Sequence, residues 1–167
     1  MPTVLGIDPG SRFTGWGIVR ADGSELHHVT HGVIKLGDRA MDLRLRDIFT
    51  SMSDLIANYD IDRFAIETSF VADNPQTAIK LGQARGVAIA AAAVQDLKVS
   101  EYAPREIKQA TVGTGRATKE QVQYMVKVLL NLAEVPDKDS ADALAVAICD
   151  IHATRYRSSI DQGLRPR

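Results

Sequence analysis

The chain has 167 residues, 45% of them hydrophobic and 25% charged, which is enough for one globular domain with its own core. The net charge of −1 lacks the basic excess that is common in nucleic-acid-binding proteins, although bound divalent cations would offset part of the acidic charge. The single cysteine, Cys149, excludes an internal disulfide framework and a zinc site built from several cysteines.

The first part of the chain predicts three antiparallel strands. Residues 4–8 form a short apolar run that ends before Pro9, which indicates a buried strand. Residues 14–20 predict a second strand. The pair Asp22-Gly23 is a strong hairpin signal, and it leads to a third strand over residues 24–35.

Helices and strands alternate after this hairpin. Apolar residues at helical spacing predict a helix over residues 39–59, and the apolar run at 63–67 predicts a buried strand. Asn74, as an N-cap before proline, starts an alanine-rich helix that runs to about residue 95. Residues 98–103 predict the fifth strand.

Three further helices complete the prediction. The first covers residues 104–113. Thr118 and Gln121 form a capping box that starts the second, and residues 139–154 form the third. Residues 155–167 are polar and basic without periodicity, which is typical of a flexible tail.

This order of elements predicts an α/β fold. Three antiparallel strands continue into parallel strands, which gives a mixed five-stranded sheet flanked by helices. We expect one folded domain over residues 1–154 and a basic tail over 155–167. No secretory signal is visible, and the longest near-apolar run, 86–94, is far below the roughly 20 residues of a membrane span. We therefore expect a cytoplasmic protein that does not enter a membrane.

Two acidic residues end predicted strands. Asp8 ends the apolar first strand, and Glu67 ends the strand at 63–67. Because α/β folds place ligands at the carboxyl ends of strands, these two residues are candidates for one shared site. Taken alone, Asp8 is equally well explained as a turn residue before Pro9. Glu67 follows an apolar run and has no evident partner.

Two more acidic residues lie at the start of the last predicted helix. Asp139 and Asp142 are three residues apart and share one helical face. Taken alone, Asp139 is explained as a helix cap. Asp142 begins an apolar, buried segment in which a carboxylate is costly unless it is paired or binds metal. Carboxylate oxygens favour Mg²⁺ or Mn²⁺, and four carboxylates can hold two ions for phosphodiester hydrolysis.

Motifs along the whole chain resemble those of RuvC-type Holliday junction resolvases. The resemblance extends from residue 3 to about 152 in the same order and spacing. The motifs are GIDPGS at 6–11, TGWG at 14–17, KLGQARG at 80–86, VGTG at 112–115 and DSADALA at 139–145.

The resemblance implies a ribonuclease-H-like fold and a homodimer. The implied activity is an endonuclease that makes paired symmetric nicks across a four-way DNA junction in recombination and repair, with RuvA and RuvB as partners. It also implies two Mg²⁺ ions per subunit, with Mn²⁺ as a substitute. The acids that it assigns to catalysis and metal binding are Asp8, Glu67, Asp139 and Asp142.

Basic and aromatic residues supply candidate DNA contacts. Lys108 and Lys119 match family positions that contact the scissile region. Phe70 keeps the spacing of a family aromatic thought to stack on bases, although Thr68-Ser69 replaces the Gln-Val that is common there. The alternatives are solvated helix surface for the basic residues and a core position for Phe70. The basic candidates are Arg85, Arg105, Lys108, Arg116 and Lys119, with Lys80 the weakest addition.

A stripe of small residues lies on the helix predicted at 75–95. Gly82, Gly86 and Ala90 recur at four-residue spacing. We expect this stripe at the interface of a symmetric dimer, because a four-way junction needs two cuts. Close packing onto the sheet of the same subunit is the alternative.

Three other functions stay open from the sequence. The motif at 6–11 also resembles the phosphate loop of actin-like ATPases and sugar kinases, but this chain is too short for the two such domains that they need. A junction-binding protein without chemistry is the second alternative, and the presence of all four acids argues against it. The third is a related nuclease that cuts RNA–DNA hybrids.

Overall fold

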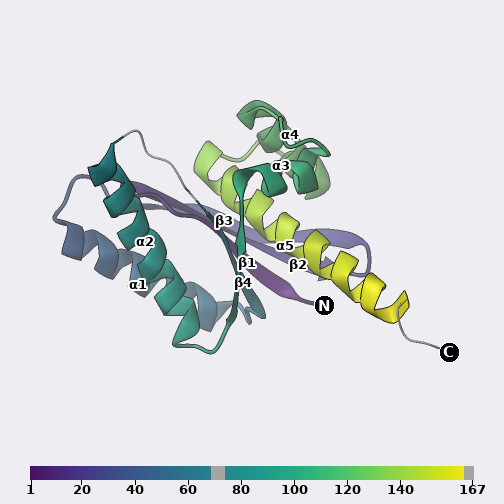
Figure 1. The fold of residues 1–167 in the computed structure, drawn as a ribbon, viewed down its shortest axis with the longest axis horizontal. Coiled ribbons are helices and arrows are strands. Elements are labelled where there is room, and N and C mark those ends of the chain that lie inside the picture. The colour runs from purple at the N-terminus through teal and green to yellow at the C-terminus, as the bar shows by residue number, and fades with distance from the viewer. Residues whose placement is uncertain (69–73, 164–167) are drawn as a thin grey trace.

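A mixed five-stranded sheet is the centre of the fold (Figure 1). The structure is a computed structural model that describes residues 1–68 and 74–163. The strand order is β3-β2-β1-β4-β5. β1 to β3 are antiparallel, whereas β4 is parallel to β1 and β5 to β4, as the sequence predicted. The strands are β1 (Thr3–Asp8), β2 (Phe13–Asp22), β3 (Glu25–Lys35), β4 (Arg63–Glu67) and β5 (Lys98–Tyr102).

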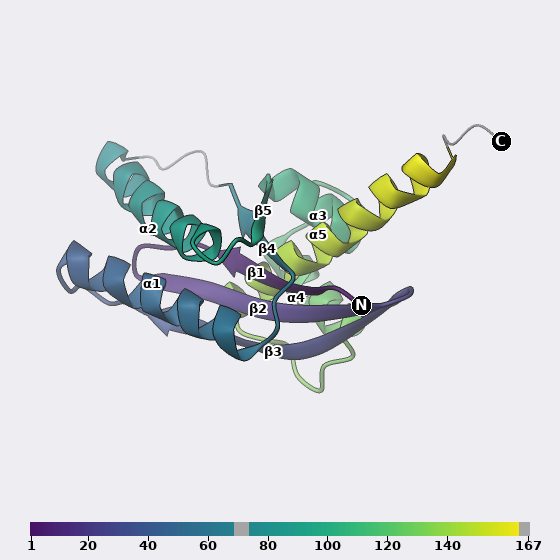
Figure 2. The same cartoon turned by 90° about the horizontal axis from the view of Figure 1, so that it is seen from below.

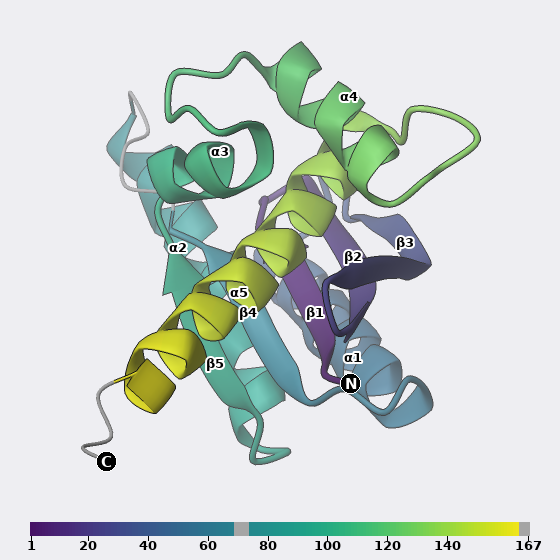
Figure 3. The ribbon, with the colours of Figure 1, turned by 90° about the vertical axis from the view of Figure 1, so that its right-hand side faces the viewer.

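Helices cover both faces of this sheet. One face carries α1 and α2, and the other carries α3, α4 and α5 (Figures 1 and 3). The helices are α1 (Met41–Asn58), α2 (Pro75–Ala93), α3 (Pro104–Val112), α4 (Lys119–Leu129) and α5 (Lys138–Gly163). Among the helices of the described ranges, none has the length and apolar character that a membrane crossing requires.

The central strand β1 contributes to both cores because its side chains alternate between the two faces. Leu5 and Ile7 are fully buried against α1 and α2, and Val4 is fully buried on the side of α5. By the same alternation, Asp8 projects toward the face that carries α5. β1 therefore places the carboxylate of Asp8 at the end of the core that α3, α4 and α5 cover.

Local signals start several of these helices where the sequence predicted. The side chain of Asn74 accepts a hydrogen bond from the backbone N–H of Gln76 at 2.8 Å, which caps α2. Thr118 and Gln121 form the predicted capping box at the start of α4. Gly113 ends α3 at a φ of 89°, a left-handed conformation that favours glycine.

The last helix is longer than the sequence indicated. We expected a loose tail from Arg155, but α5 continues to Gly163 and projects past the sheet (Figure 2). A polar segment can extend a helix that is already formed, because adding a residue costs far less than nucleation. Arg155 also donates hydrogen bonds to the carbonyl groups of Ser24 and Glu25, which fixes this part of α5 against the β2–β3 turn.

Candidate active site

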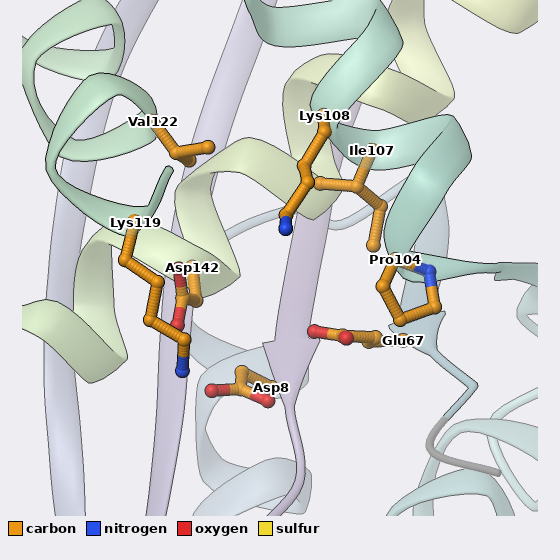
Figure 4. Close-up of a pocket in the computed structure, with 8 residues that line it drawn as sticks. All are labelled: Asp8, Glu67, Pro104, Ile107, Lys108, Lys119, Val122 and Asp142. Carbon is orange, nitrogen blue, oxygen red and sulfur yellow. The ribbon is translucent and has the colours of Figure 1, made fainter. Parts of the chain in front are cut away.

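Three of the four predicted acids meet at one edge of the sheet. Asp8 ends β1 and Glu67 ends β4, and these parallel strands are neighbours, so their carboxyl ends coincide. Asp142 reaches the same place from the first part of α5. All three line a cavity of about 270 Å³, and Figure 4 shows the carboxylates of Glu67 and Asp142 directed toward Asp8.

The start of α5 is held in place by a residue that the sequence analysis did not single out. The carboxylate of Asp137 accepts a hydrogen bond from the backbone N–H of Ser140 at 3.0 Å and from its hydroxyl at 2.6 Å. Asp137 is therefore the N-cap of α5. The signal was present in the sequence as an aspartate three residues before a serine, just ahead of a long apolar segment.

Asp139, which we considered as the cap, has a different position. It lies in the first turn of α5 and is half-buried. It is not among the described residues that line the cavity. Its negative charge nevertheless acts on the cavity, because it is one of the charges that raise the pKa values of Asp8 and Asp142.

Burial and mutual repulsion disfavour ionisation of the three acids. Burial, and then the charges of Glu67, Asp142 and Asp139, hold the pKa of Asp8 well above its usual value. Burial, followed by the charge of Asp142, raises the pKa of Glu67 to about 7. Burial also raises the pKa of Asp142, against the opposing effect of Lys119. The site therefore holds more negative charge than its own basic residues offset.

The donor set suits a hard divalent cation. The three carboxylates are half-buried, repel one another and offer only oxygen ligands, which is the chemistry that Mg²⁺ and Mn²⁺ prefer. Across the described ranges, no three acidic, histidine or cysteine side chains stand close enough to form a closed metal cluster.

Two of the predicted basic residues face these acids. Lys108 from α3 and Lys119, the first residue of α4, line the same cavity (Figure 4). Their charges lower the pKa of Glu67 against the effect of burial. The apolar part of the wall consists of Pro104, Ile107 and Val122. The motif that caps α4 at Thr118 therefore also places Lys119 opposite the carboxylates.

The other predicted DNA contacts lie away from the cavity lining. Arg105 and Arg116 are exposed on α3 and on the loop before α4. The side chain of Arg105 packs over Gly115, where a Cβ atom would meet it. Arg85 forms an ion pair with Glu101 of β5 and is partly buried. Phe70 lies outside the described residues.

Comparisons with known proteins identify the family of the chain. The family profile described as "Crossover junction endodeoxyribonuclease RuvC" matches residues 4–150. A relative of that name from Marinobacter nauticus is 51% identical over 152 residues, which is 91% of this chain and 87% of the relative. The motifs that suggested the resemblance thus belong to a similarity along nearly the whole sequence.

Solved structures agree with the sequence comparisons. A structure of T. thermophilus RuvC in complex with a Holliday junction substrate is 31% identical, has a TM-score of 0.90 and covers 94% of this chain and 97% of its own. The yeast mitochondrial Holliday junction resolvase Ydc2 is 15% identical with a TM-score of 0.68, covers 96% of this chain and 84% of its own, and shows the shared fold. The predicted ribonuclease-H-like fold is confirmed. The chain belongs to the family of RuvC crossover junction endodeoxyribonucleases.

Proposed function

We propose that this protein is a metal-dependent endonuclease that resolves four-way DNA junctions in recombination and repair by paired symmetric nicks. The observation that carries the proposal is the convergence of Asp8, Glu67 and Asp142 on one cavity from three distant segments of the chain. Two lysines on the opposite wall complete a site suited to a phosphodiester. Family membership makes a Holliday junction the expected substrate.

We infer that the four acids hold two Mg²⁺ ions per subunit and that Mn²⁺ also supports activity. Asp8, Glu67 and Asp142 line the cavity, and Asp139 is included because its charge acts on two of them. When bound, such ions supply Lewis acidity and an activated water for phosphodiester hydrolysis.

The two lysines that line the cavity have a separate role. Lys108 and Lys119 face the carboxylates, so an approaching phosphate meets positive charge from α3 and α4. In a half-enclosed site these ammonium groups stabilise the charge that develops on the phosphoryl oxygens in the transition state. They also reduce the repulsion between the acidic cluster and DNA.

More distant residues are proposed to bind the arms of the junction. Arg105 and Arg116 are exposed next to the cavity-lining helices, where they can contact phosphates. Phe70 is proposed to stack on an unpaired base. Arg85 is the weakest of these proposals, because it already pairs with Glu101.

A homodimer through α2 is the proposed assembly. Gly82, Gly86 and Ala90 are exposed, and a Cβ atom at either glycine would point into open space. The alternative that this stripe packs on its own sheet is therefore wrong, since Ala84 and Ala88 fill that role. Small exposed residues permit close approach of a second helix, and two-fold symmetry suits two cuts.

The cellular setting follows from the family resemblance. We propose that the protein acts in the bacterial cytoplasm and receives junctions from RuvA and RuvB. A binding assay between this protein and a junction loaded with both partners would test the second proposal. Binding no tighter than to the naked junction would contradict it.

Removing one acid tests the proposed chemistry. We expect Asp8→Asn to abolish cleavage of a synthetic four-way junction in Mg²⁺ while junction binding is retained, because the change removes a ligand charge and leaves the shape. Asp54→Asn on the exposed surface of α1 is the matched control and should cut normally. Normal cleavage by Asp8→Asn would rule out the assignment of the acids.

The substrate class needs its own comparison. The same enzyme preparation is given a mobile four-way junction and an RNA–DNA hybrid duplex in equal amounts, and initial rates are compared. We expect cleavage of the junction only. Faster cleavage of the hybrid would favour the related nuclease activity over junction resolution.

A further inference from the structure

The first turn of α5 touches the sheet at Gly15. A Cβ atom at this position would overlap with the carbonyl oxygen of Asp139 and lie 2.5 Å from its carbonyl carbon. Gly15 pairs with Asp8 between β2 and β1, and paired residues project to the same face of a sheet. The space that the missing side chain leaves, directly beside Asp8, is therefore filled by the backbone of α5, the helix that carries Asp139 and Asp142.

This turn has little freedom to move aside. Ser140 and Ala141 are fully buried, and Asp137 holds Ser140 by two hydrogen bonds. A methyl group at position 15 would meet rigid backbone, so the whole turn would have to rise from the sheet. Asp142 would rise with it, while Asp8 and Glu67 would stay on their strands.

Gly17 provides a useful contrast on the same strand. It also lies beneath α5, but the atoms nearest to a Cβ atom there belong to the side chain of Leu144, at 2.6 Å from Cδ2 and 2.7 Å from Cγ, with the backbone nitrogen of Leu144 farther away at 3.1 Å. Leu144 is fully buried, so its side chain can adjust only by repacking, but this costs less than moving a carbonyl group that is held in a helix. An added Cβ atom would thus meet rigid helix backbone at Gly15 but chiefly a side chain at Gly17.

We propose that Gly15 is a positioning residue for the metal site. Its lack of a side chain sets the height of the first turn of α5 above β1 and β2, and thereby the separation of Asp142 and Asp139 from Asp8. This inference rests on the proposed function, because metal binding is what the spacing serves. Metal–ligand distances tolerate deviations of about 0.2 Å, and changes in the residues that support ligands typically cost 10–100-fold in affinity or activity.

The test compares Gly15→Ala with Gly17→Ala in the full-length protein. Mg²⁺ alone is titrated by calorimetry and by its effect on the melting temperature, and junction binding is measured in EDTA. We expect Gly15→Ala to bind Mg²⁺ at least about tenfold more weakly, with unchanged junction binding and a lower kcat that raised Mg²⁺ partly restores. Gly17→Ala should lower the melting temperature but keep its Mg²⁺ affinity within about threefold.

A second pair of variants serves if Gly15→Ala does not fold. Asp137→Ala removes the hydrogen bonds that hold the first turn and should weaken Mg²⁺ binding. Asp137→Asn keeps one oxygen that can accept from the backbone N–H of Ser140, and its amide N–H can donate to the Ser140 hydroxyl, so Mg²⁺ binding should be retained. Unchanged Mg²⁺ affinity in a folded Gly15→Ala, or in Asp137→Ala, would overturn the positioning role. A native protein that neither binds Mg²⁺ nor cuts junctions would overturn the proposed function itself.

Discussion

The ionisation of Glu67 is shifted toward neutral pH in the folded protein. Burial at the end of β4 and the charge of Asp142 raise its pKa from the ordinary value of 4.5 to about 7. In the unfolded chain neither cause operates, so the Glu67 carboxyl group has its ordinary pKa. A group with a raised pKa in the folded state makes stability depend on pH in a defined direction.

We predict that the metal-free protein loses stability as the pH rises from about 4.5 to 7. Below about pH 4.5 Glu67 is protonated in both states, and between 4.5 and 7 the folded state holds the proton more tightly. The contribution of Glu67 to stability is therefore full at low pH and is lost as the pH passes 7, an effect of roughly 3 kcal/mol. Thermal melts in EDTA from pH 5 to 8 measure this decline.

Glu67→Gln is the matched variant for this prediction. Its amide does not ionise, so the decline of the melting temperature between pH 5 and 8 should be smaller than in the native protein. Saturating Mg²⁺ should raise the native melting temperature most at the alkaline end, because bound cation replaces the proton. Identical pH profiles for native and variant protein would contradict the prediction.

At the scale of elements, α5 is attached to the sheet by a buried polar group. Asp150 is fully buried and accepts hydrogen bonds from Arg63 Nε of β4 at 2.6 Å and from the hydroxyl of Tyr102 of β5 at 2.9 Å. Burial, and then the charge of Asp150, raises the pKa of the Tyr102 hydroxyl, so it remains a donor. The helix that carries two of the acids is thus joined to β4, the strand that carries Glu67.

Replacing Arg63 tests how much this attachment of α5 to β4 contributes to the free energy of unfolding. Arg63→Met leaves the Asp150 carboxylate buried without its cation, and such losses cost about 3–5 kcal/mol. Urea unfolding measures the change in the free energy of unfolding. Arg39→Met is the control, because its partner Asp47 lies at the surface and little change is expected there. A loss below about 1 kcal/mol for Arg63→Met would show that the pair contributes little.

At the scale of the whole molecule, the proposed dimer predicts coupled nicking. Gly86 lies at the centre of the exposed stripe on α2, so Gly86→Arg should separate the subunits and change paired nicks into single ones. Sedimentation and cleavage of a cruciform plasmid measure the two effects. Thr50→Arg on the exposed part of α1 is the control and should remain dimeric. A native protein that is monomeric at working concentration would exclude this interface.

Much of the fold could be predicted because its signals are local. The apolar run of β1, the cap at Asn74 and the box at Thr118 are encoded by neighbouring residues, and each lies where the sequence placed it. The convergence of Asp8 and Glu67 was also predictable from strand ends. The extension of α5 was missed because polar residues give no apolar period, although a preceding helix can continue through them.

Other features depend on how distant segments pack. Nothing near Gly82 in the sequence shows whether it faces the sheet or solvent, because that depends on which side of α2 meets the core. The placement of Lys119 opposite Glu67 depends likewise on where α4 packs against α5. Gly15 drew attention only as part of a motif, and its role becomes visible once Asp139 is seen above it.

Helix α5 both fills the core and carries two of the acids, so the loss of activity on heating is linked to the unfolding of the core. Its residues from Ala143 to Ile148 are fully inaccessible to solvent, so the helix cannot fray locally without exposing the interior. Heat inactivation should therefore coincide with cooperative melting and have no earlier phase of its own. A truncated fragment that lacks this helix would be unable to hold either a tertiary structure or a reaction centre.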